Sequence, residues 1–174
     1  MVSIDRSHAS SSARLKTVFL SLGSNLGNRE ENLQRALEFL ESEGIQIVHR
    51  SSLYKTEPQD MTAQPWFLNM VAEVATPAFP MQLLAALQRA ERALGRNRGS
   101  SVPKGPRRID IDILLFGQAV MHTARLTIPH PRMCDRRFVL EPLLEIAPDT
   151  RHPVTKQPLS RFLPSVATQK IRKV

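Results

Sequence analysis

The sequence feature that most constrains the fold is a short apolar run in which two aspartates stand two residues apart. Residues 104–117 read KGPRRIDIDILLFG. The β-branched and apolar content of IDIDILLF, with Gly-Pro before it and Gly-Gln after it, is typical of a β-strand. Because side chains alternate between the two faces of a strand, the three isoleucines point to one face while Asp110 and Asp112 point to the other. The run therefore predicts a strand over 109–116 with one apolar face and one acidic face.

The acidic face has two interpretations. At a rise of about 3.3 Å per residue, the backbone positions of Asp110 and Asp112 lie roughly 6.6 Å apart, so the two carboxylates can reach one common point. Like charges held this close either raise a pKa or bind a cation, and Mg²⁺ prefers carboxylate oxygens that it can bridge to substrate phosphates. The alternative is a half-buried strand whose outer face is only solvated. Aspartate is unfavourable in strands, which favours the first interpretation.

Length and composition indicate one soluble globular domain. The chain has 174 residues, of which 41% are hydrophobic and 23% charged, and this is enough to bury a core. Residues 1–16 contain five serines and no apolar stretch of a secretory signal, so we expect a flexible extension before a single domain over 17–174. No window reaches the ~18 apolar residues of a membrane helix. The single cysteine, Cys134, excludes an internal disulfide. We expect a cytoplasmic protein that acts as a monomer and without a membrane.

The positive charge of the chain is concentrated in two segments. The net charge is +8 and the pI is near 10.5, values that are common in nucleic-acid-binding proteins. Residues 96–108 contain five Lys or Arg and no acid, and residues 151–174 contain six and no acid. An arginine-rich loop that leads into an acidic strand fits a small polyanion better than a nucleic acid bound across the whole domain.

The order of the expected elements predicts the fold class. Apolar runs bounded by turn residues indicate strands over 17–22, 45–54, 67–75 and 109–116. Apolar residues at helical spacing indicate one helix between a capping residue at 28 and Gly44, and a second between Pro80 and Gly95. The order β-α-β-β-α-β is that of an α+β, ferredoxin-like antiparallel sheet with both helices on one face. We expect a C-terminal extension after it, with a short helix around 141–146.

Five segments carry a resemblance to a known family. In chain order they read SLGSNLGN, SSLYKTEP, QPWFLNMV, GPRRIDIDILLFG and LTIPHPRMCDRRFVLEPLLEIAPD. They resemble the 6-hydroxymethyl-7,8-dihydropterin pyrophosphokinases of folate biosynthesis, over residues 17–158. The resemblance implies transfer of pyrophosphate from ATP to the hydroxymethyl group of the pterin, with AMP as the second product. Like that family, the chain lacks the Walker A pattern GxxxxGK[ST].

The resemblance also implies a cofactor and catalytic residues. Two Mg²⁺ ions would be held by Asp110 and Asp112 and would bridge the ATP phosphates and the pterin hydroxyl, which neutralises charge and aligns the attacking and leaving oxygens. Arg96 and Arg107 would act as catalytic arginines, because guanidinium groups bind phosphate oxygens and stay charged. The implied partners are the small molecules ATP and 6-hydroxymethyl-7,8-dihydropterin, and no nucleic acid.

For ATP, the resemblance implies a set of residues from helix, strand and loops. They are Gln88, Glu91, Arg98, Arg107, Ile113, Thr127, His130 and Arg136. Gln88 and Glu91 are expected on the outer side of the second helix, facing the nucleotide, while Ile113 and Thr127 line the adenine. The alternatives are an ordinary exposed helix face, solvated arginines, and a turn role for His130 between its two prolines.

For the pterin, the resemblance implies a second set of residues. They are Thr56, Pro58, Phe67, Asn69, Asp110 and Phe138. Aromatic faces stack on a flat heterocycle, and an asparagine offers a donor and an acceptor to its pyrimidinone edge. Without the resemblance, Phe67 and Phe138 would be interpreted as core residues. Asn69 does not fit that interpretation, because it interrupts an apolar strand.

Four positions depart from the family pattern. Lys104 stands where some members have an aromatic residue, Pro103 where some have an arginine, and Pro131 where others have a tyrosine. Glu57 replaces the first of two prolines in the pterin loop. The departures concern the loops that close over substrate and leave the aspartate pair unchanged.

Two other functions fit the same fold. A basic ferredoxin-like module can bind RNA by stacking bases on aromatic residues of its sheet. Here the strand over 109–116 presents two acids instead, and aromatic residues make up only 5% of the chain. An enzyme of this fold can also transfer a nucleotidyl or a single phosphoryl group to another acceptor. The products distinguish the enzymes, because AMP indicates pyrophosphoryl transfer and ADP or free pyrophosphate the others.

Overall fold

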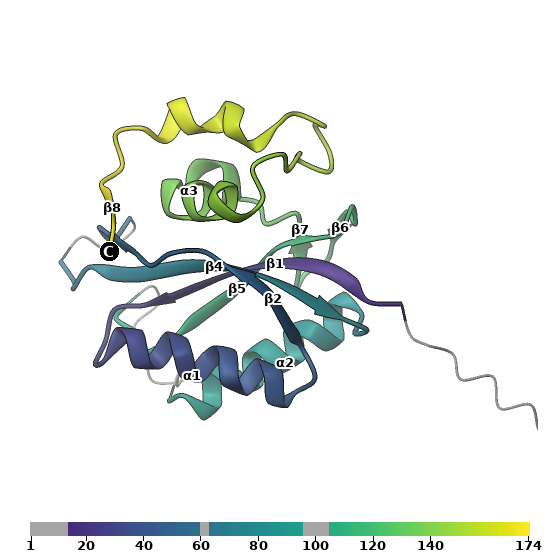
Figure 1. Ribbon diagram of the computed structural model, residues 1–174, viewed down its shortest axis with the longest axis horizontal. Helices are drawn as coiled ribbons and strands as arrows, with labels where there is room; N and C mark the ends of the chain where they lie inside the picture. The colour runs from purple at the N-terminus through teal and green to yellow at the C-terminus, as the bar shows by residue number, and fades with distance from the viewer. Residues whose placement is uncertain (1–13, 60–62, 96–104) are drawn as a thin grey trace, which may run out of the picture.

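The structure, a computed structural model, describes residues 14–59, 63–95 and 105–174. These residues form an antiparallel sheet with helices on both of its faces (Figure 1). In chain order the elements are β1 (Lys16–Ser24), α1 (Arg29–Ser42), β2 (Gln46–Arg50), β3 (Tyr54–Thr56), β4 (Phe67–Thr76), α2 (Pro80–Ala93), β5 (Asp110–Phe116), β6 (Met121–His122), β7 (Thr127–Ile128), the 3-10 helix η1 (Met133–Asp135), α3 (Arg137–Ile146), the 3-10 helix η2 (Leu159–Val166) and β8 (Ile171–Lys173).

The main sheet has six strands, and each recorded pairing in it is antiparallel. Its order is β5-β1-β4-β3-β8, and β2 pairs with β4 further along that strand. β1 is paired with β4 over its full length, from Lys16 opposite Thr76 to Ser24 opposite Leu68. The short strands β6 and β7 form a separate hairpin. The central strands are therefore β1 and β4, and β5 lies at one edge.

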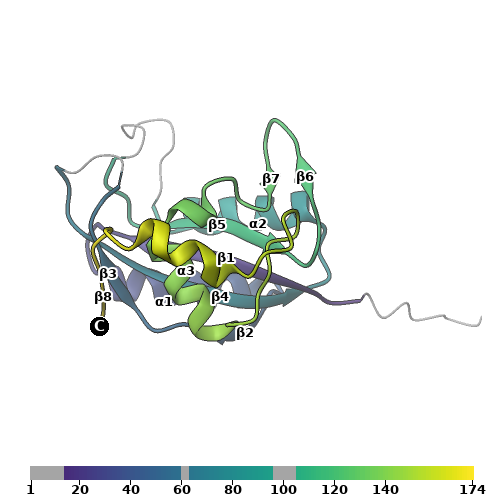
Figure 2. The same ribbon diagram turned by 90° about the horizontal axis from the view of Figure 1, so that it is seen from above.

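The helices cover the sheet in two layers. The expected placement of the first two helices on one face is confirmed, because α1 and α2 lie together below the sheet in Figure 1, while α3 and η2 lie above it. The view from above shows α3 and η2 crossing over the strands (Figure 2). Each face has its own apolar cluster: Leu20, Leu33, Leu83 and Ile111 belong to the first, and Leu140 and Leu159 to the second.

The predicted alternation of β5 is confirmed. The isoleucines at 109, 111 and 113 are at most 4% exposed and pack in the cluster under α1 and α2. The intervening carboxylates therefore point toward the α3 side of the sheet. The same alternation holds in β4, where Leu68 and Met70 are in the α1/α2 cluster and Asn69 between them faces the other side.

The strand expected over 45–54 is instead two strands, β2 and β3, which pair with β4 one after the other. The break lies at Ser51. Its backbone N–H still donates to Val71 O, but its hydroxyl accepts the hydrogen bond from Val71 N and donates one to Ser52 O. Serine side chains that bond to neighbouring backbone compete with regular pairing, which the apolar pattern did not indicate.

The helix expected around 141–146 is longer than predicted and begins at Arg137. An ion pair of 2.7 Å between Arg137 Nη2 and Glu141 Oε1 spans its first turn, at the spacing that stabilises helices. The basic segment that follows is also packed on the fold. Leu159 and Val166 of η2 are buried in the α3 cluster, and β8 pairs with β3.

Glu145 of α3 joins the helix to the sheet. Its carboxylate accepts hydrogen bonds from the backbone and hydroxyl of Ser52 and from the hydroxyl of Tyr54, and Lys173 Nζ lies 3.2 Å away. Burial alone would raise the pKa of Glu145, but these donors outweigh burial and lower the pKa to about 2. The ionised carboxylate therefore stabilises the contact between α3, β3 and β8.

We expect Glu145→Gln to remove part of the acid sensitivity of folding. A carboxyl whose pKa is lowered in the folded state stabilises the fold above its unfolded pKa, near 4.5, and loses that contribution as pH falls toward 2. The free energy of unfolding, measured by urea denaturation between pH 6 and 2.5 (roughly the window set by this linkage), should fall less in the variant. Glu141→Gln serves as the control on the same helix, and equal acid profiles for wild type and Glu145→Gln would contradict this role.

Candidate active site

A cavity opens on the α3 side of the sheet, where β1, β4 and β5 lie side by side. Its walls come from the sheet, from the segments that flank β3 and β4, and from the start of α3. The lining residues are Ser21, Gly23, Thr56, Glu57, Gln59, Gln64, Phe67, Asn69, Arg107, Asp110, Asp112, Arg136 and Phe138. Strand pairing explains why residues so distant in sequence meet there. Gly23 of β1 is opposite Asn69 of β4 on one side and Asp110 of β5 on the other.

Asn69 is held by its neighbours in this cavity. It is 4% exposed, and its amide nitrogen donates a hydrogen bond of 2.7 Å to the Thr56 hydroxyl. On its other side, a Cβ added to Gly23 would lie 2.5 Å from Asn69 Oδ1, which is closer than atoms can pack. Glycine at position 23 is therefore what allows the Asn69 amide to lie across β1.

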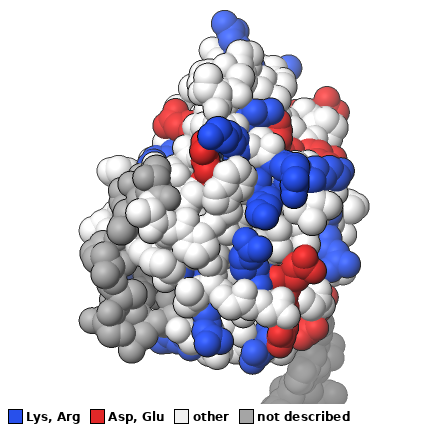
Figure 3. Space-filling model, turned by 90° about the vertical axis from the view of Figure 1, so that its left-hand side faces the viewer, with Lys and Arg blue, Asp and Glu red and all other residues white. Residues whose placement is uncertain are grey.

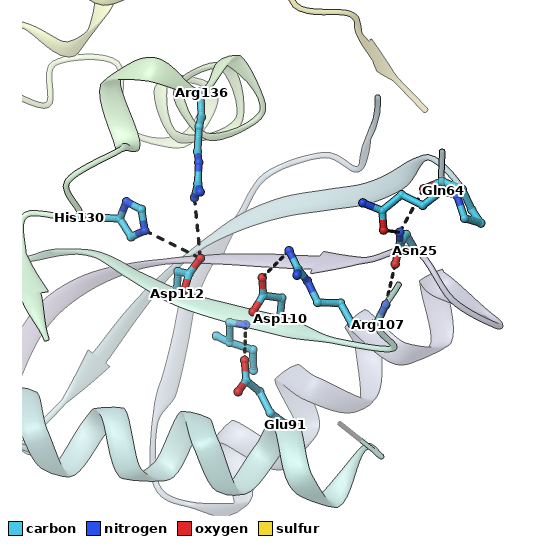
Figure 4. A network of polar contacts seen from close by, with 10 residues as sticks. Asn25, Gln64, Glu91, Arg107, Asp110, Asp112, His130 and Arg136 are labelled. Atoms are coloured by element: carbon cyan, nitrogen blue, oxygen red, sulfur yellow. Dashed lines mark hydrogen bonds and ion pairs between the residues drawn. The ribbon is translucent and has the colours of Figure 1, made fainter. Parts of the chain in front are cut away.

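The two aspartates of β5 have different cationic neighbours (Figure 4). Asp110 Oδ2 lies 3.0 Å from Arg107 Nη2, in an ion pair within the same segment. Asp112 Oδ2 lies 4.0 Å from both Arg136 Nη1 and His130 Nε2, which reach it from the α3 side. The carboxylate pair is thus surrounded by groups that can also bind anions.

The protonation of Asp112 is shifted by this setting. Although 42% of its side-chain surface faces the open cavity, desolvation of the carboxylate by the walls is the largest cause that raises its pKa, and the negative charge of Asp110 adds to it. The nearby arginines act in the opposite direction, and the pKa is raised to about 6. A cation between the two carboxylates would relieve the repulsion that contributes to this shift.

His130 is neutral near pH 7 and has a defined tautomer. Burial, followed by the positive charges of Arg136 and Arg132, lowers its pKa to about 4. Its Nδ1 accepts a hydrogen bond from the backbone N–H of Arg132, so the ring proton is on Nε2, the atom that faces Asp112. His130 thus combines the expected turn role with a donor directed into the site.

Both phenylalanines of the cavity have an arginine over the ring. The guanidinium carbon of Arg107 is 5.3 Å from the Phe67 ring centre, and that of Arg136 is 5.5 Å from the Phe138 ring centre. Both rings line the cavity and are partly buried. Phe138 also packs against the apolar cluster of α3, whereas Phe67 belongs to neither apolar cluster. The arginines connect the aromatic walls to the aspartate pair, because each of them is also close to one carboxylate.

A second cavity lies on the other side of Asp112. It is lined by part of α2, by β5 and by the segments around β7, and its polar residues include Gln88, Thr127 and His130 beside Ile113. Asp112 lines both cavities. The two hollows therefore meet at one carboxylate, with aromatic rings and an amide in one and an apolar floor with polar edges in the other.

One expected site residue lies elsewhere than predicted. Glu91 is 1% exposed and accepts a hydrogen bond of 3.0 Å from Ile111 N, so its expected position on the outer side of the helix is wrong. The sequence could not reveal this, because residue type and helical spacing do not distinguish a glutamate on a buried helix face from one on an exposed face. Pro58 is buried and is not among the described lining residues, whereas its neighbours Glu57 and Gln59 are. Arg96, Arg98, Pro103 and Lys104 lie outside the described residues.

The sequence reasoning missed residues that support the cavity. Asn25, at the end of β1, is 2% exposed and donates hydrogen bonds to Gln64 Oε1 and Pro65 O. Its side-chain oxygen also accepts from Arg107 N, so it joins the segment before β4 to the segment before β5. Ser21, an interior polar residue of an apolar strand, was the available signal that this face of β1 borders a polar site.

The carboxylate pair of β5 is the candidate set of metal ligands in the cavity. Within residues 14–59, 63–95 and 105–174, no group of three or more His, Cys, Asp or Glu side chains is placed to hold a metal ion. Asp110 and Asp112 can supply two oxygen ligands to a hard cation, and further ligands would come from substrate phosphates and water. None of the described helices has the length and apolar content of a membrane span.

Comparison with known proteins identifies the family. A sequence model described as 7,8-dihydro-6-hydroxymethylpterin-pyrophosphokinase (HPPK) matches residues 19–148. This range includes the β5 aspartates, Asn69, His130 and both phenylalanines of the cavity. The chain belongs to the HPPK family.

The relatives differ in length, because some are about as long as this chain and others are much longer. The chain is 39% identical to 2-amino-4-hydroxy-6-hydroxymethyldihydropteridine pyrophosphokinase of Aquifex aeolicus over 150 residues, which is 86% of this chain and 92% of that protein. It is 43% identical to the folic acid synthesis protein fol1 of Schizosaccharomyces pombe over 166 residues, or 95% of this chain. It spans 22% of the length of that relative.

Among solved structures, the fold resembles that of HPPK-DHPS from Plasmodium falciparum. One such structure superposes with a TM-score of 0.71 at 14% sequence identity, over 90% of this chain and 46% of that one. At this identity the likeness concerns the fold. It agrees with a mixed α/β architecture built on an antiparallel sheet.

We expect Gly23→Ala to destabilise the protein through Asn69. The added methyl group would displace the Asn69 amide and cost about 1–3 kcal/mol of unfolding free energy, as overpacking commonly does. In the background of Asn69→Ala, the same change should cost much less, because the atom it collides with is gone. Urea denaturation of the two single variants and the double variant measures this coupling, and additive losses would exclude the contact as the cause.

Proposed function

We propose that the chain transfers a pyrophosphoryl group from ATP to 6-hydroxymethyl-7,8-dihydropterin and releases AMP. The observation that carries the proposal is the meeting of two cavities at Asp112, next to Asp110. A reaction between two bound substrates needs two adjacent pockets and a polar junction between them. Membership of the HPPK family and the pyrophosphokinase activity for which the Aquifex aeolicus relative is named support the same assignment.

The cavity with the two phenylalanines fits the pterin. Phe67 and Phe138 offer aromatic faces to a flat heterocycle, and Asn69, held by Thr56, offers amide groups to its polar edge. Here the guanidinium groups of Arg107 and Arg136 each lie over one of these rings, and we propose that they move away from the rings when the pterin binds. We propose that these arginines then bind phosphate oxygens of ATP, for which their planar donors are suited.

The second cavity fits ATP. Gln88, Ile113 and Thr127 would line the adenine and ribose, with the phosphates directed toward Asp112. His130 supports this orientation, since its neutral ring directs an Nε2 proton toward the junction and can donate it to a phosphate oxygen without adding charge. Arg96 and Arg98 remain proposed as further phosphate ligands, and the buried position of Glu91 favours a supporting role for it under β5.

Asp110 and Asp112 are proposed to hold Mg²⁺. The residues present fit this ion, because both carboxylates are on the same face of β5 and the repulsion between them contributes to the raised pKa of Asp112. When bound, Mg²⁺ would neutralise phosphate charge and align the attacking hydroxyl with the β-phosphorus. Two ions are proposed, by the resemblance to the family.

The finer description of the fold is also a proposal. The pairing order of the strands, with α1 and α2 on one face, supports a ferredoxin-like core over β1 to β5, to which residues 121–174 are added. A cytoplasmic location is supported by the single cysteine. The comparisons offer no support for the alternative of an RNA-binding module.

We expect purified protein with ATP, Mg²⁺ and 6-hydroxymethyl-7,8-dihydropterin to produce AMP in a pterin-dependent reaction. Asp110→Ala and Asp112→Ala should each lower the rate at least about a thousandfold, since each removes charge stabilisation worth several kcal/mol in the transition state. Nucleotides resolved by chromatography provide the measurement. Asp149→Ala, which removes an exposed acid beyond α3, should retain the rate. ADP or free pyrophosphate instead of AMP would support the other transferase activities and exclude this one.

We expect Asn69→Ala and Gln88→Ala to affect different substrates. Loss of hydrogen bonds from a buried amide should weaken pterin binding to Asn69→Ala about tenfold or more, and leave ATP binding nearly unchanged. Gln88→Ala should do the reverse. Calorimetric titration of each variant with each substrate measures the four effects. Equal losses for both substrates in Asn69→Ala would show that the residue acts on the fold and does not read the pterin edge.

A further inference from the structure

A basic groove lies along the β8 edge of the sheet, away from the cavities described above. It is lined by four residues on which the argument depends, Arg29, Lys55, Trp66 and Arg172, together with residues 167–171 and Arg137. A neighbouring hollow shares Arg29, Lys55 and Arg172 and also contains Glu30. The face of the molecule that carries β8 displays Lys and Arg side chains across its surface (Figure 3).

Lys55 and Arg172 are directly opposite each other in the β3–β8 pair. Like charges at directly opposed positions of an antiparallel pair destabilise a sheet. Other cations at this edge are matched with acids, because Lys170 pairs with Glu57, Lys173 with Glu145 and Arg137 with Glu141. No ion pair joins Lys55 or Arg172 to a carboxylate in the part of the chain that the structure describes. Within residues 14–59, 63–95 and 105–174, the pair thus retains positive charge without an ion-pair partner.

Protection of a sheet edge explains only part of this pattern. Lysine and arginine on an edge strand prevent pairing with other chains, which accounts for Arg172 on β8. Lys55 is on β3, which is covered on both sides by β4 and β8. Edge protection also does not require the partly exposed Trp66, whose carbonyl oxygen accepts a hydrogen bond from Arg29 Nη1. That bond joins a third cation of the groove to the backbone of Trp66.

We propose that this groove is a second, non-catalytic binding site for a phosphorylated flat heterocycle such as a nucleotide. Lys55, Arg172 and Arg29 bind the phosphate, and the ring stacks on Trp66. One aromatic residue among several cations fits a single ring with a charged tail. A surface for RNA would need a series of stacking residues, and no second aromatic residue is among the described residues that line the groove.

The site is adjacent to the proposed pterin cavity through the backbone. Lys55 precedes Thr56, and Trp66 precedes Phe67, in strands that pair with each other at Thr56 and Phe67. Because neighbouring side chains of a strand point to opposite faces, Lys55 points away from the face on which Thr56 lines the cavity, and Arg137 with residues 167–171 completes the groove at the edge of the sheet. A ligand in the groove would thus contact the two strands that position Asn69 and Thr56.

The binding of AMP, measured without Mg²⁺, tests the proposal. Trp66 is the single tryptophan of the sequence, so its fluorescence reports on the groove. We expect a saturable change with AMP, and an affinity at least about tenfold lower in Lys55→Ser/Arg172→Ser, because charge-assisted hydrogen bonds to phosphate are lost. The matched control Arg14→Ser/Arg161→Ser removes two exposed charges elsewhere and should bind AMP as wild type does. Equal affinity in wild type and Lys55→Ser/Arg172→Ser would overturn the proposal, as would an equal loss in the control.

Two related ligands test the two halves of the site. Adenosine lacks the phosphate and inorganic pyrophosphate lacks the ring, so each should bind at least about tenfold more weakly than AMP. If adenosine binds as tightly as AMP, the cations do not contribute to binding. If pyrophosphate binds as tightly as AMP, Trp66 does not contribute to binding. Trp66→Leu should lower the affinity of the groove for AMP to its affinity for pyrophosphate, as measured by calorimetry.

Thermal unfolding without ligand separates binding from a structural role. Lys55→Ser/Arg172→Ser should unfold at the same temperature as wild type or above it, because two opposed like charges are removed. A lower unfolding temperature would show that the two residues stabilise the fold and would overturn the proposal. None of these measurements involves turnover, and Trp66 lines the groove and not the cavity proposed for ATP. A failure of this proposal in the Trp66 fluorescence titration is therefore distinguishable from a failure of the proposed pyrophosphoryl transfer.

Discussion

The alternation of side chains along β5 connects the core of the protein to its site. Every second residue, from Ile109 to Ile113, is buried under α1 and α2, and this burial determines which face Asp110 and Asp112 present. A shift of one residue in the register would move the isoleucines to the cavity and the carboxylates into the core. The hydrophobic packing that stabilises the sheet thereby also holds the two charges together, although desolvation and, after it, the repulsion from Asp110 raise the pKa of Asp112.

The remaining groups of the site are arranged around this pair by strand order. β1 lies between β4 and β5, and Gly23 opens a path across it, so that Asn69 and Asp110 belong to one cavity. α3, held to β3 and β8 by Glu145, begins beside Asp112 and brings Arg136 to it. Arg107 and Arg136 compensate the negative charge of the two carboxylates. If they change partner from carboxylate to substrate phosphate, the carboxylates become available to Mg²⁺, so the proposed binding of substrate and of metal is coupled.

Charged residues are paired differently at the β8 edge and in the cavity. Acids and bases of the site neutralise one another, whereas Lys55 and Arg172 at the β8 edge face each other in the pairing register. The basic C-terminal segment was visible in the sequence, but its pairing with β3 was not, because three-residue strands lack a periodic signal. Similarly, Glu91 lies under β5 because of how α2 packs on the sheet, and the position of Glu91 in the helical repeat does not predict this.

The sequence by itself determined the strands and helices of the core, the separation of Ile109 from Asp110 onto opposite faces, and the family resemblance carried by short motifs. These depend on local periodicity and on residue types, which a sequence contains directly. Only the tertiary structure decided that Asn69 lies across Gly23 from Asp110, that Asn25 joins two loops, that Ser51 divides a strand, and that two cavities meet at Asp112. Those facts depend on strand order and register, which arise from packing between segments that are distant along the chain.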